Sequence, residues 1–198
     1  MDLTEAQRRG LNTALSEATC LGLDIDEAGA TAAVTLEVLA LPVDGATAAG
    51  RTVVLHLSGV GRIAASLRSQ EWDEAKPTVY PLALGDLHDA IESFGGTHLH
   101  GWEFIDLPDS SWKQWFHLLS LDTTLSDEPA SHVLELSQEE GVDPRELDLR
   151  VWFNDLDIAD ADGQPIKLED FIECGVKWWA AHDSGDPRTR NADIAPPL

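Results

Sequence analysis

The chain has 198 residues, of which 43% are hydrophobic and 25% charged, and this composition is typical of a folded globular protein. Its 36 acidic and 13 basic side chains give a formal net charge of -23. Nucleic acids and anionic membranes bind proteins through lysine and arginine, so this charge argues against both as ligands. It favours a basic protein as a partner, because opposite potentials hasten association, although a general compositional bias would also produce an acidic surface.

The amino terminus and the cysteines bear on the compartment. The first ten residues, MDLTEAQRRG, lack the apolar core of a secretory signal, and no apolar run approaches the roughly 18 residues that cross a membrane. We therefore expect a cytoplasmic protein. Cys20 and Cys174 have no cysteine or histidine at metal-binding spacing, so we expect buried free thiols, without a disulfide, a zinc site or a cofactor.

The first half of the chain predicts mainly strands, because apolar and polar side chains alternate along it. In order, we expect a helix over residues 5–18 capped by Thr4, a hairpin over 20–41 with its turn near 27–30, strands over 51–58 and 62–68, and a helix from Asp86 to Phe94.

The second half predicts strands followed by one long helix. In order, we expect a short turn at residues 111–114, a strand from Trp115 to Asp122, a strand over 131–137, a long strand over 145–160, and a helix over 168–181. One side of that helix should pack against a sheet through Leu168, Phe171, Ile172, Val176 and Trp179, with Gly175 allowing a close approach. Before it, DADG resembles part of a calcium-binding loop, but Ile158 stands where a ligand oxygen is needed, so we expect a turn.

These elements predict an α+β fold, mainly antiparallel β-sheet, arranged as a two-sheet sandwich or open barrel with about three helices that include the N-terminal and C-terminal ones. We expect a single domain over residues 1–182 and a flexible tail over 183–198. A strand, a loop and a long strand recur in each half, which suggests a weak pseudo-repeat between 19–106 and 107–182.

The segment GVGRIA has the GxGxxA form of a dinucleotide-binding turn, with Gly59 and Gly61 as its glycines. A nucleotide-binding enzyme is therefore one hypothesis. The strand before the turn alternates between apolar and polar residues, which is typical of an antiparallel strand rather than the buried parallel strand of that fold. A glycine bend between two strands is the favoured interpretation.

The segment GTHLHGWEFID offers the other candidate site. On a strand, His98 and His100 point to the same side and could bind one metal ion, with Trp102 beside them. HLHGWE resembles the HxH and glutamate part of the cupin metal motif, which implies a metal-dependent β-barrel enzyme, although the cupin spacing to glutamate is longer by one or two residues. Glu103 points the other way unless Gly101 forms a bulge.

A third metal ligand would have to come from His56, His88 or His117. The alternative interpretation of the histidine pair is an exposed strand beside a packed tryptophan, or a site for a nonmetal ligand. The chain contains no GxSxG, P-loop or HExxH motif, so no catalytic constellation is complete. The leading hypothesis is a non-catalytic acidic binding or protein-interaction module, with His98, His100, Trp102 and Glu103 as its candidate binding residues.

Overall fold

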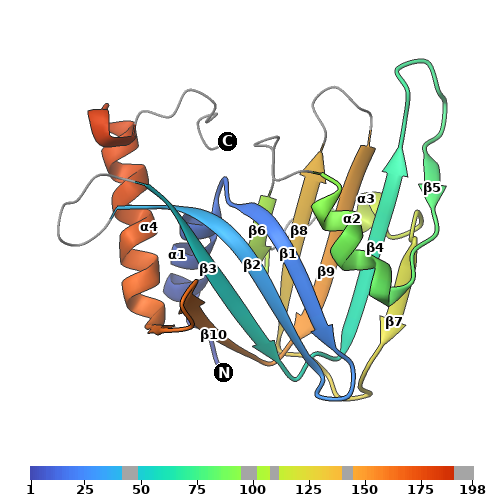
Figure 1. The fold of residues 1–198 in the computed structure, drawn as a ribbon, viewed down its shortest axis with the longest axis horizontal. Coiled ribbons are helices and arrows are strands. Elements are labelled where there is room, and N and C mark those ends of the chain that lie inside the picture. Colours follow the sequence, from blue (N-terminus) through green and yellow to red (C-terminus); the bar gives the residue numbers. More distant parts are fainter. Residues whose placement is uncertain (42–48, 95–101, 108–111, 140–144, 190–198) are drawn as a thin grey trace.

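The computed structural model describes residues 1–41, 49–94, 102–107, 112–139 and 145–189, and it contains two antiparallel sheets with helices around them (Figure 1). In order across the first sheet, the strands are β1 (Thr19–Asp26), β2 (Thr31–Ala40), β3 (Ala49–Ser58), β10 (Asp155–Asp160) and β11 (Pro165–Ile166). In order across the second sheet, they are β5 (Thr78–Tyr80), β4 (Arg62–Ser69), β9 (Arg145–Phe153), β8 (His132–Glu139) and β6 (Trp102–Ile105), with β7 (Leu121–Thr124) also paired to β4. The expected α+β class with two antiparallel sheets is confirmed.

The hairpin of β1 and β2 shows how the sequence pattern places side chains. Every second residue of β2 is buried, including Val34, Leu36 and Val38, while the residues between them are only half-buried. A strand turns alternate side chains to opposite faces of the sheet, so one face of β2 lies in the core. The predicted hairpin and its turn are confirmed.

At one corner of the molecule the chain crosses twice between the sheets. β3 continues into β4 through Gly59–Gly61, and β9 continues into β10 through Asn154. Since β3 pairs with β10 and β4 pairs with β9, both crossings occur side by side (Figure 1). The prediction of one strand over 145–160 is wrong, because its two parts belong to different sheets.

Gly59 is required at this corner for two physical reasons. Its φ of 63° lies in the left-handed region, which side chains disfavour. A Cβ atom at this position would also lie 2.9 Å from Nδ2 of Asn154, the residue of the other crossing. The predicted glycine bend between two strands is therefore present.

The hydrophobic core lies between the two sheets. Side chains from both sheets form one continuous cluster, whose fully buried members include Leu55 from the first sheet and Ile63, Leu134, Val151 and Phe153 from the second. Burying each such side chain contributes about 1.5–3 kcal/mol relative to leaving it in water. The inner faces are thus fixed by apolar burial, and charged side chains are left to the outer faces.

The N-terminal helix α1 (Glu5–Leu15) begins as predicted. The Thr4 side chain accepts a hydrogen bond from the Gln7 amide, and the Gln7 side chain accepts one from the Thr4 amide. The helix ends three residues before the expected end at residue 18, ahead of Glu17, whose φ of 59° cannot continue a helix.

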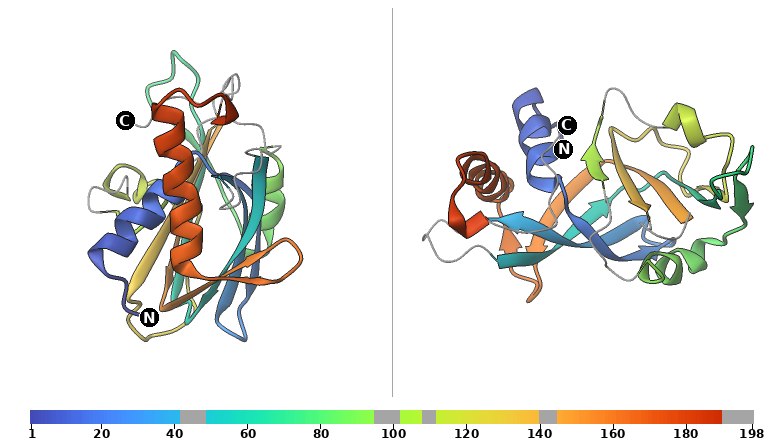
Figure 2. Two further views of the ribbon diagram at one scale, coloured as in Figure 1. Left: turned by 90° about the vertical axis from the view of Figure 1, so that its left-hand side faces the viewer. Right: turned by 90° about the horizontal axis from the view of Figure 1, so that it is seen from above.

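The C-terminal helix α4 (Leu168–Asp183) packs against α1 and β2 (Figure 2). A Cβ atom at Gly175 would lie 2.5 Å from Cα of Ala14, so the expected close approach occurs, and it is made to α1. The prediction that Val176 packs on this side is wrong, since it is exposed. Cys174 and Trp178 are buried there together with Trp179.

Three shorter elements differ from the predictions. Asp86 is the N-cap residue of α2 (Leu87–Glu92), as expected, but its side chain makes no capping hydrogen bond to α2. Its carboxylate instead accepts from the Ala83 amide at 2.8 Å, in the preceding 3-10 turn η1 (Leu84–Asp86). The strand expected from Trp115 is wrong, since α3 (Trp112–Trp115) ends there and β7 begins only at residue 121. The short strand β5 was not predicted. Ser111 and Gly95 lie outside the described residues.

Past residue 183 the described chain forms η2 (Pro187–Thr189), in which Thr189 is buried, and residues 190–198 lie outside the described part. The pseudo-repeat and the single domain over 1–182 stay predictions. Cys20 and Cys174 are buried free thiols, as expected. In the described ranges, none of the helices combines the length and the apolar character needed to cross a membrane.

Candidate functional site

The outer face of the second sheet carries charged side chains in rows across the strands. In the register of these strands, Arg68 lies opposite Glu146 and Ser66 opposite Asp148. Arg150 lies opposite Glu135 on β8. Since directly opposed residues of antiparallel strands have neighbouring side chains, the register alone brings opposite charges together.

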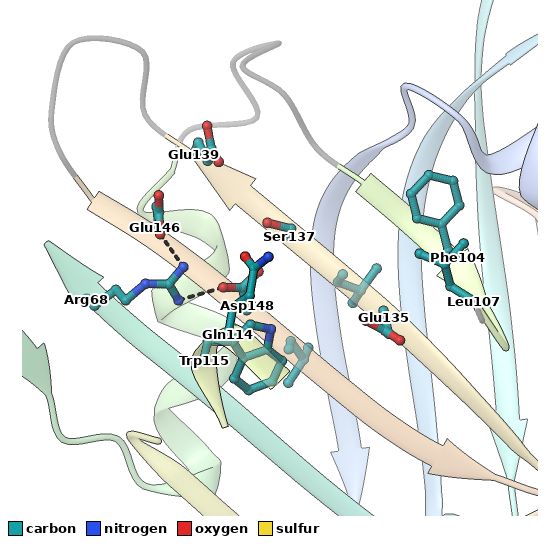
Figure 3. Close-up of a pocket in the computed structure, with 12 residues that line it drawn as sticks. Arg68, Phe104, Leu107, Gln114, Trp115, Glu135, Ser137, Glu139, Glu146 and Asp148 are labelled. Carbon is teal, nitrogen blue, oxygen red and sulfur yellow. Dashed lines mark hydrogen bonds and ion pairs between the residues drawn. The ribbon is translucent and has the colours of Figure 1, made fainter. Parts of the chain in front are cut away.

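These charges form ion pairs, and those of Arg68 with Asp148 and Glu146 are drawn in Figure 3. Arg68 donates from Nη1 to the Asp148 carboxylate at 2.5 Å, and its Nη2 pairs with Glu146. Arg150 pairs with Glu135. Asp148 and Glu135 are only 5% and 7% exposed, so each carboxylate depends on its guanidinium partner for the solvation that it has lost.

Near the corner where the chain crosses between the sheets, tryptophan rings lie beside the arginine side chains of this outer face. The Arg62 guanidinium lies 4.7 Å from the Trp152 ring and 5.6 Å from the Trp112 ring, and that of Arg150 lies 5.1 Å from Trp112. Arg62 also donates two hydrogen bonds of 2.7 Å to Asp122 on β7, which raise the pKa of the guanidinium. These contacts attach α3 and β7 to the sheet.

The turn after α3 is held on the same face by hydroxyl groups. The Ser66 hydroxyl donates to the Leu118 carbonyl at 2.7 Å, and the Ser120 hydroxyl accepts from the Leu67 amide at 2.8 Å. The Trp115 side chain is consequently buried against the sheet, at 2% exposure. The outer face of the second sheet is therefore partly covered.

Between this cover and the sheet lies a pocket of about 370 Å³, the size of a small-ligand site. Its described lining comes from β4, β6, β8 and β9 and from the segments around α3, and consists of Arg68, Phe104, Leu107, Gln114, Trp115, Glu135, Leu136, Ser137, Glu139, Glu146, Asp148 and Leu149 (Figure 3). Four carboxylates stand against one guanidinium in this lining, so the pocket is negatively charged. Trp115 and Phe104 supply aromatic surface.

The groups that line the pocket are mainly carboxylates and aromatic or aliphatic side chains. Among its described residues there is no histidine or cysteine, and Ser137 supplies the only hydroxyl group. Three of the carboxylates already accept charge-assisted bonds from Arg68 or Arg150. The described lining therefore places an excess of negative charge beside aromatic rings.

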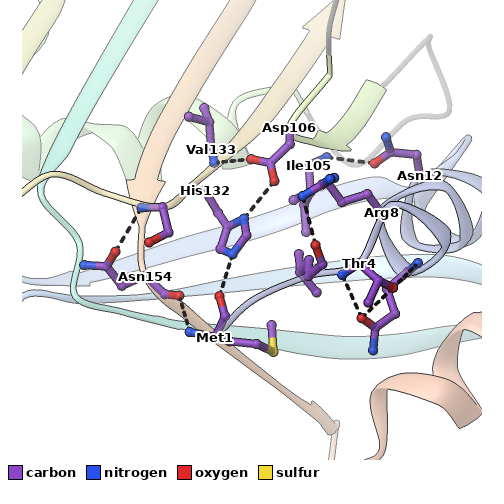
Figure 4. Close-up of polar contacts among 12 residues, drawn as sticks. Met1, Thr4, Arg8, Asn12, Ile105, Asp106, His132, Val133 and Asn154 are labelled. Atoms are coloured by element: carbon purple, nitrogen blue, oxygen red, sulfur yellow. Dashed lines mark hydrogen bonds and ion pairs between the residues drawn. The ribbon is translucent and has the colours of Figure 1, made fainter.

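A second polar cluster, at the other end of β8, has a structural role (Figure 4). His132 is 4% exposed, and its Nδ1 lies 2.7 Å from the Asp106 carboxylate while Nε2 lies 2.8 Å from the Met1 carbonyl. The other Asp106 oxygen accepts from the Val133 amide at 2.9 Å. Both ring nitrogens of His132 and both carboxylate oxygens of Asp106 thus have partners within the chain, and these contacts join the segment before α1 to the sheet.

The residues that the sequence singled out lie mostly elsewhere. His98 and His100 are outside the described residues. Trp102 and Glu103 begin β6, where their backbones pair with Ser137 and Leu136 in regular antiparallel register. The structure thus places the start of β6 beside a pocket-lining strand, but it does not test whether the histidine pair binds metal.

The histidines considered as a third ligand are dispersed. His56 is exposed on β3 in the first sheet, whereas His117 follows α3 on the second. His88 on α2 has Asp24 3.6 Å from its Nδ1 and Glu92 3.4 Å from its Nε2, on opposite sides of the ring. In the part of the chain that the structure describes, no three histidine, cysteine or acidic side chains are grouped so as to bind a metal ion.

Gly59 and Gly61 lie in the strand-to-strand corner, and β4 follows them where a dinucleotide site has a helix. The amides that would face a pyrophosphate are already used, because Val60 donates to the Ala30 carbonyl and Gly61 to the Trp152 carbonyl, both at 2.9 Å. The nucleotide-binding hypothesis receives no support from this segment.

Sequence reasoning missed the pocket, because Arg68, Glu135 and Asp148 are far apart in the chain. The one sequence signal for these residues is the alternating charged row Glu146, Asp148 and Arg150 on β9. It indicates a site only when the strands that pair with β9 are known. Comparison with protein-family models, curated proteins and solved structures returns no match. The fold and the site define an α+β protein of two antiparallel sheets with an acidic pocket on the outer face of the second.

Proposed function

We propose that this protein is a non-catalytic binding module, and that its outer-face pocket takes a cationic side chain of a basic protein partner. The observation that carries the proposal is the pocket lining, in which four carboxylates and one guanidinium surround a cavity of about 370 Å³ walled by Trp115 and Phe104. Carboxylates and ring faces are the two kinds of group that recognise an ammonium or a guanidinium.

The bulk charge of the chain supports the same partner. With a net charge of -23, the protein attracts a basic surface over a long range and repels phosphate backbones. Electrostatic attraction of this kind raises the association rate, while the pocket supplies the specific contact. Neither a nucleic acid nor an anionic membrane fits this field. Cytoplasmic location remains part of the proposal, and the free thiols of Cys20 and Cys174 agree with a reducing compartment.

Charge-neutralised variants test the proposal with two oligopeptides, deca-arginine and deca-lysine, as probes. The double variant Glu139→Gln/Glu146→Gln removes two pocket charges. We expect it to bind deca-arginine at least 10-fold more weakly than the wild type does by titration calorimetry, which corresponds to about 1.4 kcal/mol. The effect should be larger for deca-arginine than for deca-lysine, because a guanidinium also stacks on aromatic rings.

The matched control is Glu27→Gln/Asp157→Asn, which makes the same change in net charge at exposed positions of the first sheet and its hairpin turn. We expect less than a 2-fold change in affinity for this control. Equal weakening in the two double variants would show that the peptide responds only to total charge, and the pocket proposal would then be wrong.

The metal-dependent enzyme at His98 and His100 is the competing hypothesis from the sequence. Elemental analysis of protein purified without a histidine tag tests it directly. A stoichiometric transition metal, together with a raised melting temperature on adding zinc or manganese, would favour the enzyme over the binding module.

A further inference from the structure

The most exposed large apolar side chain in the described residues is Trp72, in the loop between β4 and β5. Its relative exposure is 104%, whereas the next most exposed, Phe116, reaches 49%. Single exposed apolar residues are common on protein surfaces, but tryptophan is also the residue most enriched among the few that dominate binding energy at interfaces. The hydrogen bonds and charges of the loop around Trp72 distinguish an interface residue from an incidental exposed one.

The loop around Trp72 is closed by its own hydrogen bonds. The Glu74 amide donates to the Glu71 carbonyl at 3.0 Å, and the Glu71 amide donates to the Glu74 carboxylate at 3.2 Å. The Gln70 side-chain amide donates to the Glu74 carbonyl at 2.9 Å. The backbone around Trp72 thus forms a hydrogen-bonded turn, so less backbone entropy is lost when its ring is buried by a partner.

The base of the hairpin is also fixed. Leu67 pairs with Tyr80 and Ser69 with Thr78 in the register of β4 and β5. The Ser69 and Tyr80 hydroxyl groups are 2.7 Å apart, which adds a side-chain link between the strands. The base of the loop is therefore joined to β4, the strand that carries Arg68 of the acidic pocket.

Charge identifies the kind of surface that can receive this ring. Glu71, Asp73 and Glu74 flank Trp72, and Lys76 is the one base of the loop. An anionic membrane would be repelled by these carboxylates, and so would a second copy of a chain with a net charge of -23. A pocket that is apolar at its centre and basic at its rim is complementary to both the ring and the carboxylates.

The hairpin tip and the acidic pocket lie toward the same end of the second sheet. Ser69, the last residue of β4, is paired with Arg145, the first residue of β9, and Glu139 ends β8 beside Glu146 (Figure 1). A partner that meets the Glu139 and Glu146 end of the pocket therefore faces the end of β4 from which the hairpin projects.

We propose that Trp72 is an anchor that inserts into an apolar, basic-rimmed pocket of the same protein partner that the acidic pocket binds. The inference rests on the proposed function for the basic nature of this partner. It adds a second contact, which supplies apolar binding energy where the pocket supplies charge recognition. Loss of the ring is expected to weaken binding by roughly 30- to 100-fold, as for other central tryptophan anchors.

Site-specific photo-crosslinking identifies the partner. The full chain carrying p-benzoylphenylalanine in place of Trp72 is irradiated in an extract of the cells that produce the protein naturally, beside a control with the same replacement at Val176, which is exposed on α4. We expect one basic protein to be cross-linked through position 72 and not through position 176. Cross-linking only to a second copy of this chain, to lipid, or to no protein would overturn the proposal.

Titration calorimetry with the purified cross-linked protein then separates the two proposals. We expect Trp72→Ala to weaken binding by roughly 30- to 100-fold, Trp72→Phe by about 5-fold or less, and Val176→Ala by less than 2-fold. Unchanged affinity for Trp72→Ala overturns the anchor, whatever the pocket does. If Trp72→Ala weakens binding but Glu139→Gln/Glu146→Gln does not, the anchor stands and the pocket proposal fails.

Discussion

On the first sheet, the side chains of β2 and β3 that point away from the core are mostly uncharged, as at Thr35 and Val54, with Glu37 as the exception. The charged Asp157 of β10 is exposed opposite His56. On the second sheet, the corresponding positions hold Arg68, Asp148, Arg150 and Glu135, and α3 with its following turn covers part of them. The inner faces of both sheets are mainly apolar.

This difference shows where a sheet protein can place a binding site. An ion pair in water contributes little, because each charge is already well solvated. The pairs of the second sheet have lost much of that solvation, so their geometry is tightly constrained and the pocket beside them keeps a fixed field. The comparison predicts that equivalent substitutions have similar effects on the two inner faces and very different effects on the two outer faces.

The largest effects are expected on the inner faces. Leu55→Ala in the first sheet and Leu149→Ala in the second remove side chains that are 0% and 1% exposed. Each should lower the free energy of unfolding by about 3–4 kcal/mol, through lost burial and the cavity that remains. Urea unfolding measures both, and Val54→Ala on the outer face should cost less than about 1 kcal/mol. A loss of less than about 1 kcal/mol for either leucine variant would mean that its side chain is not packed in the shared core.

The outer faces should separate clearly. Glu135→Ala leaves the Arg150 guanidinium, whose side chain is only 12% exposed, without its carboxylate. We expect a loss of about 3 kcal/mol in unfolding free energy, because an uncompensated charge stays shielded from water. Asp157→Ala on the first sheet should change it by less than about 0.5 kcal/mol. Similar losses of unfolding free energy in the two variants would show that the outer faces of the two sheets do not differ as described.

The corner that joins the sheets gives a smaller effect. Gly59→Ala forces a side chain into a left-handed conformation and against Asn154, so we expect a loss of about 2 kcal/mol. Gly163→Ala is the matched control, because its φ is 78° but nothing lies within 4 Å of an added Cβ atom. It should cost about 1 kcal/mol. Equal losses in thermal or urea unfolding would show that the contact with Asn154 at the crossing adds nothing.

The smallest effect concerns an exposed ion pair on neither sheet. Hydrogen bonds from Arg188 lower the Asp186 pKa to about 2 from an ordinary value of 3.8. Because the folded pKa is the lower one, the pair stabilises the protein above about pH 4, and this contribution is lost as the pH falls toward 2. Arg188→Ala should return the Asp186 pKa to near its ordinary value in an NMR titration, with little change in stability at pH 7. A pKa that stays near 2 would show that other groups lower it.

Local patterns predicted the strands well where one face is buried. The alternation along β2 and β9 indicates which side chains enter the core, because the pleat turns every second residue to the same face. Capping by Thr4 and the apolar side of α4 are likewise local signals, although the exposure of Val176 shows that apolar spacing does not decide which helix face is covered. The buried face of α4 is the one on which Gly175 contacts Ala14 of α1, so it depends on how the two helices pack together.

The sequence by itself determined the fold class, the inner faces of the strands and the negative charge, because burial and charge are carried by individual residues at regular spacing. Only the tertiary structure decided that the chain changes sheets at Asn154 and that Arg68 meets Asp148. Both depend on the register between strands far apart in the chain, which alternation within one strand does not specify. The acidic pocket and the isolation of Trp72 at a hairpin tip follow from that register, so they became visible only in three dimensions.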